Sequence, residues 1–178
     1  MKERSTPRAQ QDPGRRPPRG TAKDRALLLL GVRWRSREEL RVRLTRAGFE
    51  IPDVEQALAD LERTGLVDDQ RFAREVVRAQ GAGRLSGDRA IRAALRQKGV
   101  SPTDVEEALD EAGEEAGRAR ELASRRARRL VGLGPEAAYR RLFGQLVRRG
   151  YGPAVAREAC RAALADLLAG ESISEGDA

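Results

Sequence analysis

Apolar residues recur along this chain with a period of 51 positions. Three triplets of residues keep this spacing: Leu40, Ile91 and Leu142; Leu44, Leu95 and Leu146; Gly48, Gly99 and Gly150. A bulkier residue follows each glycine, namely Phe49, Val100 and Tyr151. Repetition at a fixed interval is the signature of a repeat protein, so the pattern predicts an array of similar units.

Within each unit the apolar positions are spaced as on amphipathic helices, and the alternation typical of strands is absent. We therefore predict an all-α fold of three tandem three-helix units in an elongated array, with a helix-turn-helix-like pair in each unit. The expected helices cover residues 22–32, 36–47, 51–64, 68–83, 86–98, 101–113, 116–131, 134–149 and 152–168.

The predicted units occupy residues 22–65, 66–114 and 115–169. Residues 1–21 form an extension rich in proline and arginine with almost nothing apolar, so we expect them to be disordered. Residues 170–178 form an acidic tail, which we expect to be flexible.

Capping signals mark several helix ends. Ser36 with Glu39 forms a capping box pattern, Ser101 precedes a proline, Asp68 and Ser86 are expected caps, and Pro135 opens a helix. We expect the three repeat glycines to end their helices in the left-handed conformation. The bulky residue after each glycine should then fill the corner between two helices.

The sequence offers little for catalysis. It contains no histidine, a single cysteine at position 160 and no glycine-rich phosphate loop. Neighbouring acidic residues point in different directions on a helix, so we expect no metal site, no cofactor and no enzymatic activity. A metal-dependent nuclease built from scattered carboxylates remains the enzymatic alternative.

No stretch reaches the ~20 apolar residues of a membrane span. We expect a cytoplasmic monomer.

Charge is the remaining signal. The chain has 35 basic and 28 acidic residues, a net charge of +7, and the two signs are segregated. Residues 84–98 and 118–149 are strongly basic, whereas 101–115 carry acidic residues and no basic ones. The acidic segment could pair with its basic neighbours inside the protein. The excess of arginine in the third unit favours a surface for a polyanion or an acidic protein groove.

Three stretches resemble the RecX family of regulatory proteins: RSREELRVRLTRAGF at 35–49, GLVDDQRFAREVVRAQ at 65–80 and GDRAIRAALRQKGVS at 87–101. The resemblance covers about residues 24–168 and implies three tandem three-helix repeats in a curved molecule. It also implies a function in recombination and DNA repair. RecX proteins bind the RecA recombinase in the helical groove of its DNA filament and inhibit filament growth, ATPase and strand exchange, or promote disassembly.

We expect the basic residues of the second and third units to face the RecA–DNA filament: Arg84, Arg89, Arg92, Arg96, Lys98, Arg125, Arg126, Arg129, Arg140, Arg141 and Arg148. In the LVDDQRFA motif we predict structural roles. Leu66 and Phe72 should pack, Asp68 should cap a helix and Arg71 should brace the turn. Trp34 is expected to be a buried anchor, with a partner contact as the alternative.

Two other functions remain open. The protein could bind DNA or RNA by itself through backbone phosphates, which predicts tight and salt-dependent binding without RecA. Weak direct DNA binding is also compatible with RecA regulation. A scaffold that presents the acidic segment around 101–113 to a basic protein predicts neither activity.

Overall fold

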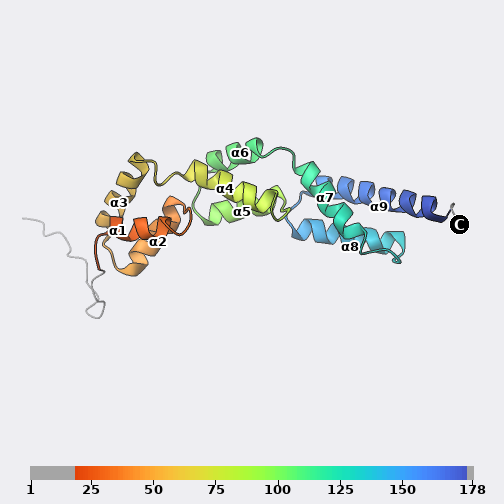
Figure 1. Cartoon of the computed structure of the whole chain (residues 1–178), viewed down its shortest axis with the longest axis horizontal. Helices are drawn as coiled ribbons and strands as arrows, with labels where there is room; N and C mark the ends of the chain where they lie inside the picture. The colour runs from red at the N-terminus through yellow and green to blue at the C-terminus, as the bar shows by residue number, and fades with distance from the viewer. Residues whose placement is uncertain (1–18, 176–178) are drawn as a thin grey trace, which may run out of the picture.

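The computed structural model describes residues 19–175, and this part of the chain contains nine helices and no strand. Figure 1 shows them in three groups that follow one another along the longest axis. The first module contains α1 (Ala22–Leu30), α2 (Arg37–Ala47) and α3 (Ile51–Arg63). The second contains α4 (Asp69–Gly81), α5 (Asp88–Gln97) and α6 (Pro102–Glu111), and the third contains α7 (Glu115–Ala127), α8 (Pro135–Arg148) and α9 (Pro153–Glu175). The predicted all-α array is confirmed.

Each module has its own hydrophobic core. The buried residues form three separate clusters, and the repeat leucines and isoleucine lie in them in pairs: Leu40 and Leu44, Ile91 and Leu95, Leu142 and Leu146. All six are fully buried. A thin core per module suits a chain with few large side chains, because each unit needs only its neighbours for further burial.

The corner after each middle helix is built as predicted. Gly48, Gly99 and Gly150 have φ angles of 101°, 73° and 90°, which only glycine adopts without strain. The following residue is buried in each module, and its amide donates to the carbonyl of the last core leucine at 3.2 to 3.3 Å. The 51-residue period of the sequence therefore reflects the same helix ending, which is repeated in each module.

Helix caps are confirmed at Ser36, Asp68 and Ser101, whose side chains each accept a backbone amide in the first turn. The prediction for Ser86 is wrong. Gly87 is the residue before α5, and it has no side chain to cap with. The first amide of α5, that of Asp88, instead donates to Oε1 of Glu115 at 2.8 Å. The cap comes from the next module, so local sequence could not reveal it.

In the LVDDQRFA motif, Phe72 packs as predicted but Leu66 does not. Leu66 is 45% exposed, while Val67 is 3% exposed and lies in the first core. The turn explains this shift, since Gly65 has a φ of 70° and the amides of both following residues converge on the carbonyl of Leu61. The chain thereby turns Val67 inward.

Trp34 is not the buried anchor we expected, because it is 36% exposed. The guanidinium carbon of Arg71 lies 4.1 Å from the centre of its ring, in a cation–π contact. Trp34 belongs to the first module and Arg71 to the second. The side chain of Arg71 thus contacts the first module, and in its own helix only its backbone amide takes part, as the donor to the Asp68 cap.

The helix α9 extends to Glu175, past the expected end at 168 and into the expected flexible tail of 170–178. Gly170 does not end it, and a glycine inside a helix costs only about 1 kcal/mol relative to alanine. The expectations for residues 1–18 and 176–178 lie outside the described residues. No described helix is long and apolar enough to span a membrane.

Two joints connect the modules in the same way. At the first joint the hydroxyl of Ser36 donates to the carbonyl of Lys98 at 2.6 Å, and the amide of Arg37 donates to Oδ1 of Asp69 at 2.8 Å. At the second, the amide of Gly87 donates to the carbonyl of Arg149 at 2.9 Å. The starts of α2 and α5 therefore each sit on the glycine corner of the next module, which fixes the direction of the array.

Candidate partner-binding surface

A basic surface lies on the third module and the segment that leads into it. Three adjoining clefts of about 420, 440 and 360 Å³ share Arg126 as a wall. We call their basic lining the arginine groove, formed by Arg84, Arg125, Arg126, Arg129, Arg141, Arg148 and Arg149. No carboxylate is among the described residues that line these clefts.

Helix periodicity explains why these arginines gather. On α8, Arg141, Gln145 and Arg148 recur at intervals of one or two turns, while Leu142 and Leu146 point into the core. On α7, the buried Leu122 lies one turn before Arg126 and lines the cleft between α7 and α8. Four of the groove arginines thus lie on the polar sides of α7 and α8, whose apolar sides build the third core, and the other three lie in the segments that flank helices: Arg84, Arg129 and Arg149.

The charges of the groove are almost uncompensated inside the protein. Among the described residues, Arg125 pairs with Glu121 on its own helix. The other six have no described carboxylate within the 4.0 Å of an ion pair. Guanidinium groups suit carboxylates and phosphates because they present planar pairs of donors. The groove therefore has the charge and the hydrogen-bond donors that binding an anion requires.

Six of the eleven basic residues expected at the partner surface line the groove, namely Arg84, Arg125, Arg126, Arg129, Arg141 and Arg148. Arg149 was missing from that set, although it forms a doublet with Arg148 in the sequence. Its role at the second joint, where its carbonyl accepts the amide of Gly87, was not visible from the sequence.

The remaining five lie elsewhere. Arg89 and Arg96 are exposed on α5 and Arg140 on α8, and none of them lines the groove. Arg92 forms a two-pronged ion pair with Glu106 at 2.8 Å, and Lys98 pairs with Glu39 at 2.8 Å. The interpretation that α6 pairs with basic neighbours thus holds for Arg92.

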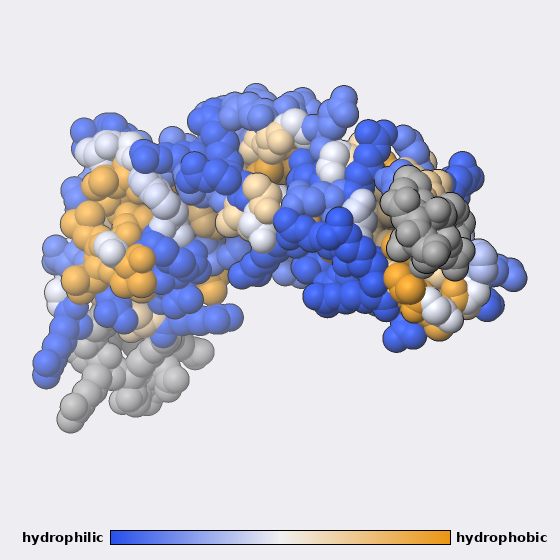
Figure 2. Space-filling view, turned by 45° about the vertical axis from the view of Figure 1, so that its right-hand side comes forward, coloured by the Kyte–Doolittle hydropathy of each residue, from blue (hydrophilic) through white to orange (hydrophobic). Residues whose placement is uncertain are grey.

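Figure 2 shows how the surface is distributed. The outline arches over a hollow between the first and third modules, and the middle of this arch is mostly hydrophilic, with small apolar patches. Apolar surface appears on the modules at both ends. In the first module, the exposed apolar residues include Leu28 and Val32 of the α1 region, and in the third they include Val131 and Leu133.

The described residues contain no group of three or more histidine, cysteine, aspartate or glutamate side chains that could hold a metal ion. The single thiol, Cys160, is buried in the third core, and burial raises its pKa to about 11.

Three family models match the chain, one for each module. They describe the first, second and third three-helix domains of RecX and match residues 22–61, 68–109 and 114–160. The boundaries agree with the three modules seen in the structure.

Similar proteins carry the same name. Regulatory protein RecX of Amycolatopsis mediterranei (strain U-32) is 41% identical over 135 residues, which cover 73% of this chain and 75% of that protein. Regulatory protein RecX of Mycobacterium tuberculosis (strain ATCC 25177 / H37Ra) is 37% identical over 149 residues, 80% of this chain and 84% of that protein.

Two solved structures are similar. A crystal structure of regulatory protein RecX superimposes with a TM-score of 0.69 at 27% identity, covering 75% of this chain and 68% of that chain. RecX from Lactobacillus salivarius superimposes with a TM-score of 0.73 at 19% identity, covering 80% and 94% respectively, a likeness of fold alone.

Proposed function

The chain belongs to the RecX family of regulatory proteins, and on that premise we propose that it binds the RecA recombinase on DNA and inhibits its ATPase and strand exchange. In this role it modulates recombination and DNA repair in the cytoplasm, as a monomer and without catalysis of its own. The observation that carries the proposal is an elongated array with an arginine groove at its third module, of whose seven arginines only Arg125 pairs with a described carboxylate.

An elongated array suits a filament. Each module presents its own face, so one molecule can touch several filament subunits and gain avidity from contacts that are weak individually. A RecA–DNA filament also exposes phosphates, and a groove lined by arginine can displace their counterions. The two joints hold the modules in a fixed order, so that such contacts can form together.

The test is a titration of RecA ATPase on single-stranded DNA with the full chain. We compare it with Arg126→Glu/Arg141→Glu, which reverses two groove charges, and with Arg157→Glu/Arg161→Glu, which makes the same charge change on exposed residues of α9 outside the clefts. We expect inhibition by the wild type and by the α9 variant, and loss of inhibition by the groove variant. If the wild type leaves ATPase and filament length unchanged, the proposal fails.

A second candidate function is nucleic-acid binding without RecA. The absence of carboxylates from the described lining of the groove favours it, since phosphates meet no repulsion there. Its measurement is direct binding to DNA at two salt concentrations. Tight binding with a steep loss at higher salt, together with unchanged RecA ATPase, would favour this function over regulation of RecA.

The scaffold function has less support. The three glutamates of α6 are engaged within the second module: Glu106 with Arg92, Glu111 with Arg74 and Glu107 with Gln70. A basic partner would have to replace these contacts before it could use the helix.

A further inference from the structure

We propose that a cavity at the first joint is a second binding site, which takes a carboxylate on an amphipathic protein segment. We call it the joint pocket. It has a volume of about 470 Å³ and is lined by α1, α2 and the end of α5, with Arg25, Leu29, Val42, Arg43, Arg46 and Gln97 among its walls. Its residues are separate from the arginine groove of the third module.

The pocket carries uncompensated positive charge. Two glutamates also line it, but both are engaged. Glu38 accepts two hydrogen bonds from Arg41 at 2.7 Å, and Glu39 accepts hydrogen bonds from Arg33 and Lys98 at 2.8 to 3.2 Å. The three arginines of the lining, Arg25, Arg43 and Arg46, have no described carboxylate within 4.0 Å.

A buried arginine behind the wall gives a second, independent observation. Arg35 is 7% exposed, and its Nε donates to the carbonyl of Leu29, a residue of the pocket wall, at 3.1 Å. Its Nη1 is buried and has no hydrogen-bond partner within the described part of the chain. Burial, and then the like charges of Arg33 and Arg43, lower the pKa of Arg35. An anion in the pocket would relieve this repulsion.

The rest of the lining selects the class of ligand. Leu29, Val42 and Ala47 give the pocket an apolar part. On α1, Leu28 is 66% exposed and lies about one turn from Arg25, so it extends apolar surface beside the charge. Arginine beside apolar surface fits an acidic side chain with apolar neighbours, as on an amphipathic helix. A run of phosphates would leave this apolar surface uncovered, so a protein segment fits better than a nucleic acid.

The two sites then have different partners. The joint pocket takes protein, and the arginine groove, whose described lining lacks acidic residues, takes phosphate. They lie in different modules, so both can be occupied at once. This inference goes beyond the proposed function, because it holds for an acidic amphipathic segment whether or not RecA supplies it.

The experiment uses two fluorescent probes and the full chain. One probe is an amphipathic helical peptide of glutamate, leucine and alanine, and the other is an oligothymidylate. Anisotropy titrations compare the wild type with Arg43→Glu/Arg46→Glu in the pocket, Arg126→Glu/Arg141→Glu in the groove and Arg157→Glu/Arg161→Glu on α9. All three variants change the net charge equally, and circular dichroism checks that each is folded.

We expect the pocket variant to bind the peptide at least about tenfold more weakly than the α9 variant does, with oligothymidylate binding kept. The groove variant should bind oligothymidylate more weakly than the α9 variant does, with peptide binding kept. Peptide binding that is equal in the pocket and α9 variants overturns the proposal, and so does a wild type that binds no peptide. Loss of oligothymidylate binding in the pocket variant, with peptide binding kept, makes the pocket a nucleic-acid site and also overturns it. The RecA titration is a separate measurement, so its failure affects only the proposed function.

Discussion

Gly150 lies so close to Ala90 that a Cβ added to the glycine would stand 2.4 Å from the Cβ of Ala90. The equivalent glycine at the first joint, Gly99, has the same relationship with Glu38, also at 2.4 Å. Each of these glycines therefore serves twice. It ends a helix in the left-handed conformation, and its lack of a Cβ lets the middle helix of the preceding module pack directly against its backbone.

We predict that Gly150→Ala destabilises the protein by about 2 to 4 kcal/mol, from the left-handed conformation and from overpacking at the joint. Gly132→Ala is the matched control, because Gly132 has a φ of 87° and an added Cβ would meet nothing within 4 Å. It should lose only the conformational part, about 1 to 2 kcal/mol. Urea unfolding measures both. Equal losses would mean that close approach contributes nothing.

Glu39 gives the first joint a pH dependence. Burial opposes its ionisation, but hydrogen bonds from Arg33 and Lys98 outweigh burial and lower its pKa to about 2 from an ordinary value of 4.5. A lowered pKa means that the ionised form stabilises the fold at pH values above 4.5, and that this stability is lost as the pH falls towards 2.

We predict that Glu39→Gln costs about 2 kcal/mol at neutral pH and weakens the loss of stability between pH 4.5 and 2. Urea unfolding at a series of pH values measures this. Glu158→Gln is the control, because Glu158 pairs with Arg120 on exposed surface, where an ion pair contributes little. If the free energy of unfolding of Glu39→Gln changed with pH in parallel with that of the wild type, Glu39 would not be the source of this pH dependence.

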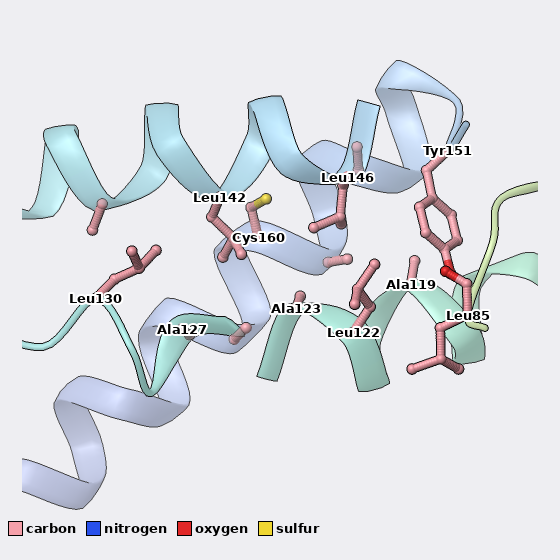
Figure 3. Close-up of a cluster of buried hydrophobic side chains, with 14 residues drawn as sticks. Leu85, Ala119, Leu122, Ala123, Ala127, Leu130, Leu142, Leu146, Tyr151 and Cys160 are labelled. Atoms are coloured by element: carbon pink, nitrogen blue, oxygen red, sulfur yellow. The ribbon is translucent and has the colours of Figure 1, made fainter. Parts of the chain in front are cut away.

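Tyr151 ties the second joint to the third core. Its hydroxyl donates to the carbonyl of Leu85 at 2.9 Å, and Figure 3 shows the ring reaching from the corner after α8 to Leu85. Leu85 comes from the segment between α4 and α5 yet packs in the third core. We predict that Tyr151→Phe costs about 1 to 2 kcal/mol, because it leaves this buried carbonyl unpaired.

The same residue predicts a loss of stability in alkali. Burial raises the pKa of Tyr151 to about 12 from an ordinary value of 10.0. Its neutral form therefore stabilises the fold below pH 10, and this stability is lost as the pH rises towards 12. Between these pH values, the free energy of unfolding obtained from unfolding curves should fall less steeply for Tyr151→Phe than for the wild type. Parallel curves would show that the phenol does not titrate in this way.

Local features of the fold could be predicted from the sequence, whereas the contacts between modules could not. The glycine corners depend on one residue and its neighbours, so the 51-residue period revealed them. The hydrogen bond from Ser36 to Lys98 joins residues 62 positions apart, and no local pattern encodes it. The wrong cap at Ser86 has the same cause, because the amide of the next helix is capped by Glu115 of another module.

The candidate site was predicted in part for a related reason. Doublets such as Arg125–Arg126 and Arg140–Arg141 marked the basic third module, but neighbours in sequence point to different sides of a helix. Only Arg141 of the second doublet reaches the groove. The joint pocket was missed altogether, since Arg43 and Arg46 lie in a segment of mixed charge and gain significance only beside Arg25 of another helix.

Cys160 offers a way to test whether the three cores are energetically separate. Its thiol is fully buried in the third core, and burial raises its pKa to about 11, so it should react slowly with a thiol reagent while the third module is closed. In an array whose modules touch only their neighbours, opening of one end need not open the other.

We predict that Tyr151→Phe speeds the labelling of Cys160 about tenfold, since a loss of about 1.4 kcal/mol raises the open population by that factor. Glu39→Gln, which acts at the first joint, should leave the labelling rate unchanged despite a similar loss of stability. Labelling with a chromogenic thiol reagent under native conditions measures both. If Glu39→Gln accelerates labelling as much as Tyr151→Phe does, the modules unfold as one unit, and separate cores in the structure do not imply separate stabilities.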